Sequence, residues 1–200
     1  MFIQMIEGKV ADEAGLRAQL EAWRSDQQPK ADGWLGTTSG FTADGTFVGI
    51  VRFESEAAAK ANAERPEQGE WWAATAATFD GDVSFTDCPD VDTFGAGGSD
   101  DAGFVQIMTG RGDRSEIAPL AEELSAILAR IRPDVIGGTV GWPGDGSFVQ
   151  TVYFTSEGEA RTAESADPAS EEDRAAGERL NSLMTVERFI DLPNPMLYSR

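Results

Sequence analysis

The 200-residue sequence contains no histidine and a single cysteine, Cys88, so any chemistry must rest on other side chains. Ser-His-Asp and Cys-His catalysis, His-ligated zinc and a haem held by a proximal histidine are therefore excluded. Cys88 cannot form an internal disulfide, and we interpret it as a small buried apolar side chain. Carboxylates, amides, hydroxyls, arginines, tyrosines or a bound cofactor remain as the reactive groups.

A strand face in the first half of the chain is the best candidate for a pocket. Alternation along residues 47–53 places Gly49 and Phe53 on one face, with Gln4 on the corresponding face of the first strand. If this face looks toward the helices, Gly49 leaves a gap in the sheet surface. The second half has Gln150 at the equivalent position, which would fill or polarise the same space.

Helical segments that follow this strand supply the remaining candidates, Asn62, Trp71 and Trp72. Two alternatives stay open. The tryptophans could simply cover the sheet, with their indole N–H groups satisfied locally. Gln4 and its counterpart Gln106 could each make a structural hydrogen bond to the backbone rather than contact a ligand.

A sequence repeat positions these residues. Residues 36–56 recur at 137–157 with more than half of the aligned residues identical, including an Asp-Gly pair that indicates a tight hairpin. Each copy has the pattern strand, helix, strand, strand, broken helix, strand, which is the ferredoxin-like arrangement. The expected strands cover residues 2–6, 34–41, 47–53 and 83–86 in the first copy and 104–108, 135–142, 148–154 and 184–187 in the second.

We predict an α+β fold of two ferredoxin-like β-α-β-β-α-β repeats, residues 1–88 and 103–192. Residues 89–102, rich in Asp and Gly, are interpreted as a linker, and residues 193–200 as a C-terminal tail. Both sheets have an apolar face turned away from the helices, so we expect them to pack face to face as an intramolecular dimeric α+β barrel.

Two larger side chains, Arg52 and Tyr153, occupy equivalent positions on this sheet-to-sheet face. A buried arginine needs compensation for its charge. We therefore expect Arg52 to pair with a carboxylate near an open end of the barrel.

The charge balance narrows the range of partners. The chain carries 35 acidic and 16 basic residues, a formal net charge of -19, which repels nucleic acids and anionic membranes. It has no apolar run long enough to span a membrane and no acidic loop with metal-binding spacing. We expect a cytoplasmic protein without a metal, a monomer with an internal pseudo-dimer or a weak homodimer.

The order of a Gly-rich strand, an Asp-Gly turn, a strand ending in Phe-x-Ser-Glu and an Ala-rich broken helix resembles the dimeric α+β barrel superfamily. The most similar branch is the antibiotic biosynthesis monooxygenase-like (ABM) domains. The resemblance covers nearly the whole chain, as two fused copies of a unit that usually dimerises. It implies a ligand cleft between sheet and helices in each unit, with Phe53 and Phe154 as the aromatic residues that end the third strand and with Gln4 and Gln106 as the polar residues of the first.

The resemblance also leads to a functional hypothesis. Where related proteins often carry a pocket histidine, this chain has Asn62 and Ala163, which argues against haem degradation. We expect a cofactor-independent monooxygenase or related enzyme for a small aromatic or polyketide-like substrate, with Trp72 and Phe53 as an apolar wall and Asn62 and Gln4 orienting a carbonyl or phenolate oxygen. The alternative is a non-catalytic module that binds a small apolar ligand or a protein partner.

Overall fold

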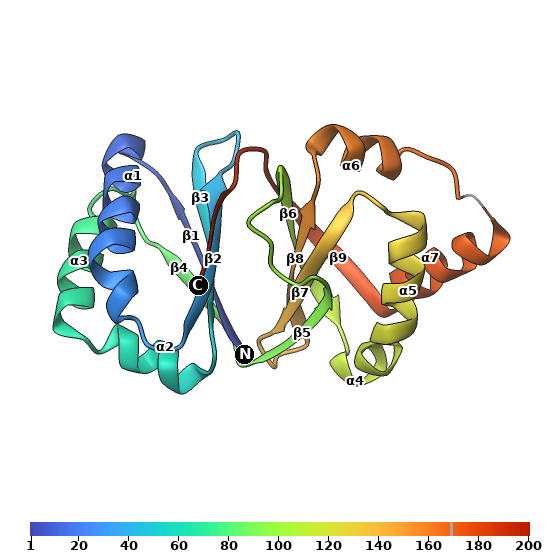
Figure 1. Cartoon of the computed structure of the whole chain (residues 1–200), viewed down its shortest axis with the longest axis horizontal. Coiled ribbons are helices and arrows are strands. Elements are labelled where there is room, and N and C mark those ends of the chain that lie inside the picture. The colour runs from blue at the N-terminus through green and yellow to red at the C-terminus, as the bar shows by residue number, and fades with distance from the viewer. Residues whose placement is uncertain (169) are drawn as a thin grey trace.

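The protein is built of four layers, with helices on both outer faces and two β-sheets packed between them (Figure 1). The computed structural model describes residues 1–168 and 170–200. The predicted order of strands and helices is confirmed in both repeats, as is the α+β class.

The first repeat comprises β1 (Phe2–Lys9), α1 (Glu13–Ala22), the π-helical turn η1 (Trp23–Gln27), the 3-10 turn η2 (Gln28–Lys30), β2 (Trp34–Phe41), β3 (Thr46–Phe53), α2 (Glu56–Ala63), α3 (Pro66–Ala76) and β4 (Ser84–Cys88). The second comprises β6 (Phe104–Gly112), α4 (Arg114–Ile117), the 3-10 turn η3 (Ala118–Leu120), α5 (Ala121–Ile131), β7 (Val135–Trp142), β8 (Ser147–Phe154), α6 (Glu157–Glu164), α7 (Glu171–Leu183) and β9 (Met184–Leu192). Two further strands are β5 (Asp90–Gly95) and β10 (Met196–Ser199).

These two strands are where the structure departs from the sequence interpretation. The expected linker, 89–102, contains β5, which pairs with β7, and the expected tail, 193–200, contains β10, which pairs with β2. The sheets therefore have five strands each, in the orders β10-β2-β3-β1-β4 and β5-β7-β8-β6-β9. Unpaired backbone groups along β2 and β7 explain the difference, since an open sheet edge favours an added strand.

Local sequence explains where the helices begin. Asp12 and Ser55 cap α1 and α2, and their side-chain oxygens accept hydrogen bonds from the backbone N–H groups of Gly15 and Ala58. Pro66 starts α3 at a position where its missing N–H costs nothing. The break between α2 and α3 thus tilts two short helices across one sheet face.

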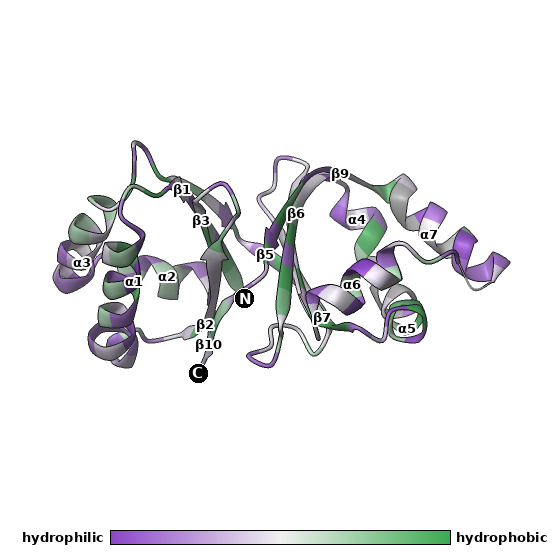
Figure 2. Ribbon diagram, turned by 90° about the horizontal axis from the view of Figure 1, so that it is seen from above, coloured by the Kyte–Doolittle hydropathy of each residue, from purple (hydrophilic) through white to green (hydrophobic). Residues whose placement is uncertain are grey.

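The apolar sheet faces meet in the middle of the molecule, as predicted (Figure 2). The buried cluster between the sheets comprises Ile3, Met5, Val48, Ile50, Cys88, Val105, Ile107, Val149, Tyr153, Ile190 and Leu192. Burial of the Cys88 thiol raises its pKa to about 12, so it is an inert part of this core.

Arg52 lies on the inter-sheet face, as predicted, but the prediction that it pairs with a carboxylate was wrong. Among the described residues no carboxylate forms an ion pair with Arg52; its Nη1 atom donates to the hydroxyls of Thr38 (3.2 Å) and Tyr153 (2.5 Å). The side chain is 5% exposed. A guanidinium in this position is solvated by hydroxyl dipoles rather than neutralised.

Candidate functional site

A cleft of about 490 Å³ lies in the first repeat between the sheet and helices α1 to α3. The predicted face of β3 looks into it, and Gly49, Val51 and Phe53 all line the cleft, as does Gln4 of β1. Asn62, Trp71 and Trp72 line it from α2 and α3. The structure thus brings all six residues proposed from the sequence to one cavity.

The walls of the cleft are mainly aromatic. The rings form a continuous series whose neighbouring centroids lie 5.5 Å (Trp34 and Trp23), 6.3 Å (Trp23 and Trp71), 5.9 Å (Trp71 and Trp72) and 5.2 Å (Trp72 and Phe85) apart. The series runs from the fully buried Trp34 to Phe85, which is half exposed on β4. Neighbouring ring planes are inclined by 50° to 67°, and an aromatic lining of this kind favours an apolar ligand.

Hydrogen bonds distinguish Trp72 from the other three tryptophans that line the cleft. The bonded indole N–H groups are those of Trp23 (to Gln68 Oε1, 2.8 Å), Trp34 (to Thr37 Oγ1, 3.1 Å) and Trp71 (to the Gln19 carbonyl, 2.7 Å). The indole N–H of Trp72 has no acceptor among the residues that the structure describes. Trp71 is thus a covering residue with a local partner, whereas Trp72 retains a free donor at the cleft.

The Asn62 amide is held in one orientation. Its Oδ1 atom accepts a hydrogen bond from Arg65 Nη1 (2.9 Å), and Arg65 is itself fixed by Gln27 Oε1 (2.6 Å). Because an arginine can only donate, the Asn62 oxygen must face Arg65. The Asn62 NH₂ group has no acceptor in the described part of the chain, and the residue lines the cleft while only 8% exposed, so a donor is available there to a ligand.

Gln4 offers the complementary group. Its Nε2 atom donates to Asp87 Oδ1 (2.7 Å), a side-chain partner on β4 rather than the backbone bond considered above. This fixes the Gln4 amide so that its Oε1 atom remains an acceptor. Asp87 also lines the cleft, so a carboxylate stands beside the amide.

Ser39 was missed by sequence reasoning. It is paired with Gly49 across β2 and β3, is 2% exposed, lines the cleft and has no side-chain hydrogen bond among the described residues. The second repeat has Val140 paired with Gln150 at the same place. A comparison of the two copies at this position was the signal that could have identified Ser39.

Tyr198 was also missed, and no local signal would have found it. It lies on β10 opposite Thr37 and lines the cleft, with the Arg24 guanidinium 4.9 Å from its ring centroid. The end of the chain therefore completes a site in the first repeat.

The corresponding cleft of the second repeat is smaller, about 130 Å³. Phe94 of β5 lies across Gly138, with its ring 2.3 Å from where a Cβ atom would stand, and Gln150 occupies the place of Gly49. Elsewhere in the second repeat, the Arg161 guanidinium lies 5.0 Å from the Phe104 ring centroid and pairs with Asp191.

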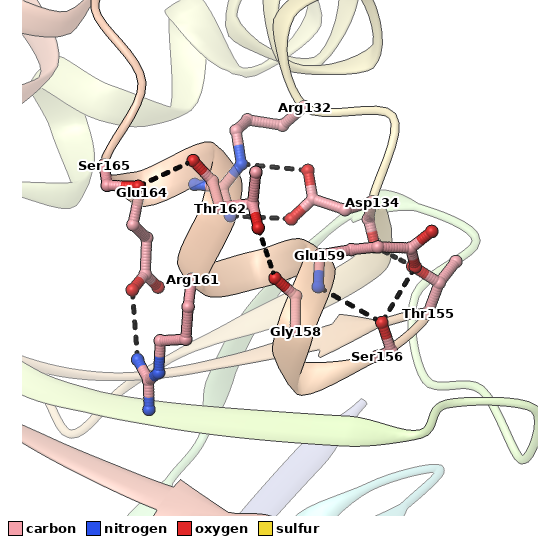
Figure 3. A network of polar contacts seen from close by, with 10 residues as sticks. All are labelled: Arg132, Asp134, Thr155, Ser156, Gly158, Glu159, Arg161, Thr162, Glu164 and Ser165. Atoms are coloured by element: carbon pink, nitrogen blue, oxygen red, sulfur yellow. Dashed lines mark hydrogen bonds and ion pairs between the residues drawn. The ribbon is translucent and has the colours of Figure 1, made fainter.

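Figure 3 shows the helix that carries this arginine. Ser156 Oγ accepts a hydrogen bond from the backbone N–H of Glu159 (3.2 Å), and the Glu159 carboxylate accepts from the hydroxyls of Thr155 (2.5 Å) and Ser156 (2.9 Å). The Thr155 and Ser156 hydroxyls lower the pKa of Glu159. Arg161 Nη1 donates to Glu164 Oε2 (3.0 Å), so this arginine is held in place on the capped helix α6, outside the lining of the second cleft.

Among the side chains that the structure describes, no group of three or more His, Cys, Asp or Glu residues could hold a metal ion. None of the helices described is long and apolar enough to cross a membrane.

Comparison with known proteins establishes the fold. The sequence matches no protein-family model and no curated protein. Among solved structures, a putative monooxygenase from Lactobacillus acidophilus is 10% identical with a TM-score of 0.69, covering 99% of each chain. A second, from Fusobacterium nucleatum, is 11% identical with a TM-score of 0.70, covering 100% of this chain and 97% of that one. An anthrone oxidase-like protein is 10% identical with a TM-score of 0.60, covering 98% of this chain and 93% of that one. The predicted resemblance is confirmed at the level of the fold.

Proposed function

We propose, from the fold shared with these monooxygenase-like proteins and from the geometry of the first cleft, that this chain is a cofactor-independent monooxygenase-like enzyme acting on a small aromatic or polyketide-like substrate. The observation that carries the proposal is the pairing of a free amide donor at Asn62 with a free amide acceptor at Gln4 in an aromatic cleft. This pair suits a planar ligand that bears both a carbonyl or phenolate oxygen and a hydroxyl.

Different cleft residues bind the substrate and activate it. Trp72 and Phe53 hold the ring system, while Gln4 accepts a hydrogen bond from a substrate hydroxyl. Asn62 donates to the oxygen on which negative charge develops, where a fixed dipole is most effective. Asp87, held by Gln4, is the base placed to accept a substrate proton.

The reaction balances without a further reductant. A methylene group next to a phenolic ring loses two C–H bonds and becomes a carbonyl, a four-electron oxidation. Dioxygen accepts the four electrons, leaving one oxygen atom in the product and releasing the other as water. An anthrone is a substrate of this chemistry, and the name of one structural neighbour, an anthrone oxidase-like protein, motivates its choice as the first probe.

The test combines oxygen consumption with quinone absorbance, using a hydroxylated anthrone and the wild-type protein. Asn62→Ala should lower kcat/KM by about 100-fold, because removal of one donor to a developing oxyanion costs that much in other enzymes. Gln4→Ala should also lower it, whereas the matched control Gln106→Ala changes the equivalent residue of the second repeat and should leave the rate unchanged.

A second function is favoured by the absence of histidine and by the small size of the second cleft. The protein would then bind the aromatic ligand without converting it. Saturable quenching of tryptophan fluorescence by the anthrone with no oxygen uptake would establish this alternative and refute the enzyme, and absence of both would refute both small-molecule functions.

A further inference from the structure

A second cavity, of about 290 Å³, lies on the other side of the first sheet, at the seam between the two repeats. It is lined by Arg52 from β3, Thr139 from β7, Thr93 from β5 and the turn 95–98 that follows β5. Figure 1 shows β5 beside the start of β1, where the two sheets meet. This cavity is separate from the aromatic cleft, which faces the helices.

The cavity contains a buried positive charge with unused donors. Arg52 is 5% exposed, and the two hydroxyls of Thr38 and Tyr153 both contact its Nη1 atom. Its Nε and Nη2 atoms have no hydrogen-bond acceptor in the described chain. The first carboxylate after the turn, Asp100, is occupied by the backbone N–H and the hydroxyl of Ser199, both at 2.9 Å. The two hydroxyls solvate only one nitrogen of the guanidinium, and a buried arginine is costly without an anion, so the solvation of this charge is incomplete.

A buried hydroxyl in the same cavity is also incomplete. Thr139 is 1% exposed, and its Oγ1 atom has no hydrogen-bond partner among the residues described. Buried polar groups are nearly always paired, so an orphan hydroxyl in a polar cavity indicates a missing partner. Its neighbour across the strands, Thr151, has an orphan hydroxyl as well but does not line the cavity, which makes it a natural control.

The turn after β5 brings the backbone close to the guanidinium. Gly95 and Gly97 have positive φ angles of 55° and 71°, which glycine adopts without strain. A Cβ atom at Gly98 would stand 2.3 Å from Arg52 Nη1, so residue 98 can approach this closely only as glycine. Glycine at position 98 therefore lets the turn pack directly against the Arg52 guanidinium.

We propose that this inter-repeat cavity binds a small oxyanion, a carboxylate or a phosphate. Arg52 supplies the charge and the paired Nε and Nη2 donors, whose fork geometry matches two anion oxygens. After rotation about its Cα–Cβ bond, the enclosed Thr139 hydroxyl donates to a third. Because the anion contacts β3 of one repeat and β7 of the other, its binding stabilises the closed arrangement of the two sheets.

The experiment measures the thermal unfolding midpoint of the full chain in phosphate, in acetate and in chloride at equal ionic strength. Millimolar concentrations are used, since higher phosphate stabilises proteins generally through exclusion from their surface. At about 100 times its Kd, a specific anion should raise the midpoint by about 5–10 °C above the chloride value. Comparison of phosphate with acetate identifies which oxyanion the site takes.

Three variants connect the shift to the cavity. Arg52→Met should abolish the anion-dependent shift. Thr139→Val should weaken anion binding by about tenfold, the effect of one lost hydrogen bond to a charged group, without lowering the midpoint in chloride. Thr151→Val should leave the anion-dependent shift at its wild-type size.

The outcomes are decisive in both directions. Equal midpoints in phosphate, acetate and chloride for the wild type would overturn the proposal, as would an undiminished shift in Thr139→Val. If Arg52→Met does not fold, the pair Thr139→Val and Thr151→Val alone decides. Neither result depends on turnover in the aromatic cleft, so the two proposals fail separately.

Discussion

The two clefts of this molecule are built on the same strands, yet one is open and the other nearly filled. The difference comes from a few equivalent positions: Ser39 and Gly49 in the first repeat stand where the second has Val140 and Gln150. In addition, Asp191 of the second repeat pairs with Arg161 and accepts a hydrogen bond from Gln106, whereas the carboxylate of Asp87 accepts only from Gln4 among its described side-chain partners. A duplicated unit can thus keep its fold in both copies while keeping a cavity in one.

The edge strands extend this contrast. In the second sheet β5 places Phe94 over Gly138, and the aromatic ring enters the space that the cleft would occupy. In the first sheet β10 places Tyr198 opposite Thr37, where it forms a wall and leaves the cavity free. An added edge strand thus narrows the cleft of the second repeat, whereas the added edge strand of the first repeat completes the wall of its cleft.

The largest effect is expected when Ser39 and Gly49 are replaced by the residues that stand at the equivalent positions of the second repeat. The double variant Ser39→Val with Gly49→Gln should reduce anthrone binding by about 100-fold, because the new side chain starts 3.2 Å from the Phe47 ring and must extend into the cleft. Overpacking of this kind also costs about 1–3 kcal/mol of stability. Fluorescence titration and urea unfolding measure the two effects.

The control for this variant is a glycine with open space around it. Gly158→Ala in α6 has no atom within 4 Å of the new Cβ atom and should stabilise the helix by about 0.5–1 kcal/mol without changing ligand affinity. Wild-type affinity in the double variant would show that the cleft is not where the anthrone binds.

A smaller effect is expected at the edge strand. Tyr198→Ala should weaken anthrone binding by about tenfold, about 1.4 kcal/mol, through loss of one aromatic wall. Tyr198→Phe keeps the ring and should bind nearly as well as the wild type. If alanine and phenylalanine weaken binding equally, the hydroxyl rather than the ring is what matters, and the wall described here is wrong.

Sequence reasoning reached the core of this fold because the repeated stretch contains local signals. The Asp-Gly turns, the alternation along β3 and the gap at Gly49 are all readable over a few residues. The sequence did not predict β5 and β10, because these strands pair with open sheet edges far away in the sequence. Their amino-acid composition is also typical of loops. The partner of Arg52 was missed for a related reason: the hydroxyls that solvate it come from β2 and from the other repeat.

The smallest effect is expected on the acid stability that the two hairpin turns contribute. The Thr42 hydroxyl, followed by Lys9 and Thr46, lowers the pKa of Asp44 from 3.8 to about 2, and the Ser147 hydroxyl and backbone N–H lower the pKa of Asp145 in the second turn. A carboxylate with a depressed pKa in the folded state stabilises the protein above its unfolded pKa and loses that contribution as pH falls.

We therefore expect the free energy of unfolding to decrease between about pH 4 and pH 2, the interval between the unfolded and folded pKa values of Asp44. Asp44→Asn should flatten this part of the curve, measured by urea unfolding at a series of pH values. Asp145→Asn should flatten it less, since fewer side chains hold that carboxylate. Among the described residues, Ser147 alone donates a side-chain hydrogen bond to Asp145, whereas Thr42, Thr46 and Lys9 donate to Asp44. An equal change in both variants would show that the two turns contribute alike, and that the contrast between the repeats is confined to their clefts.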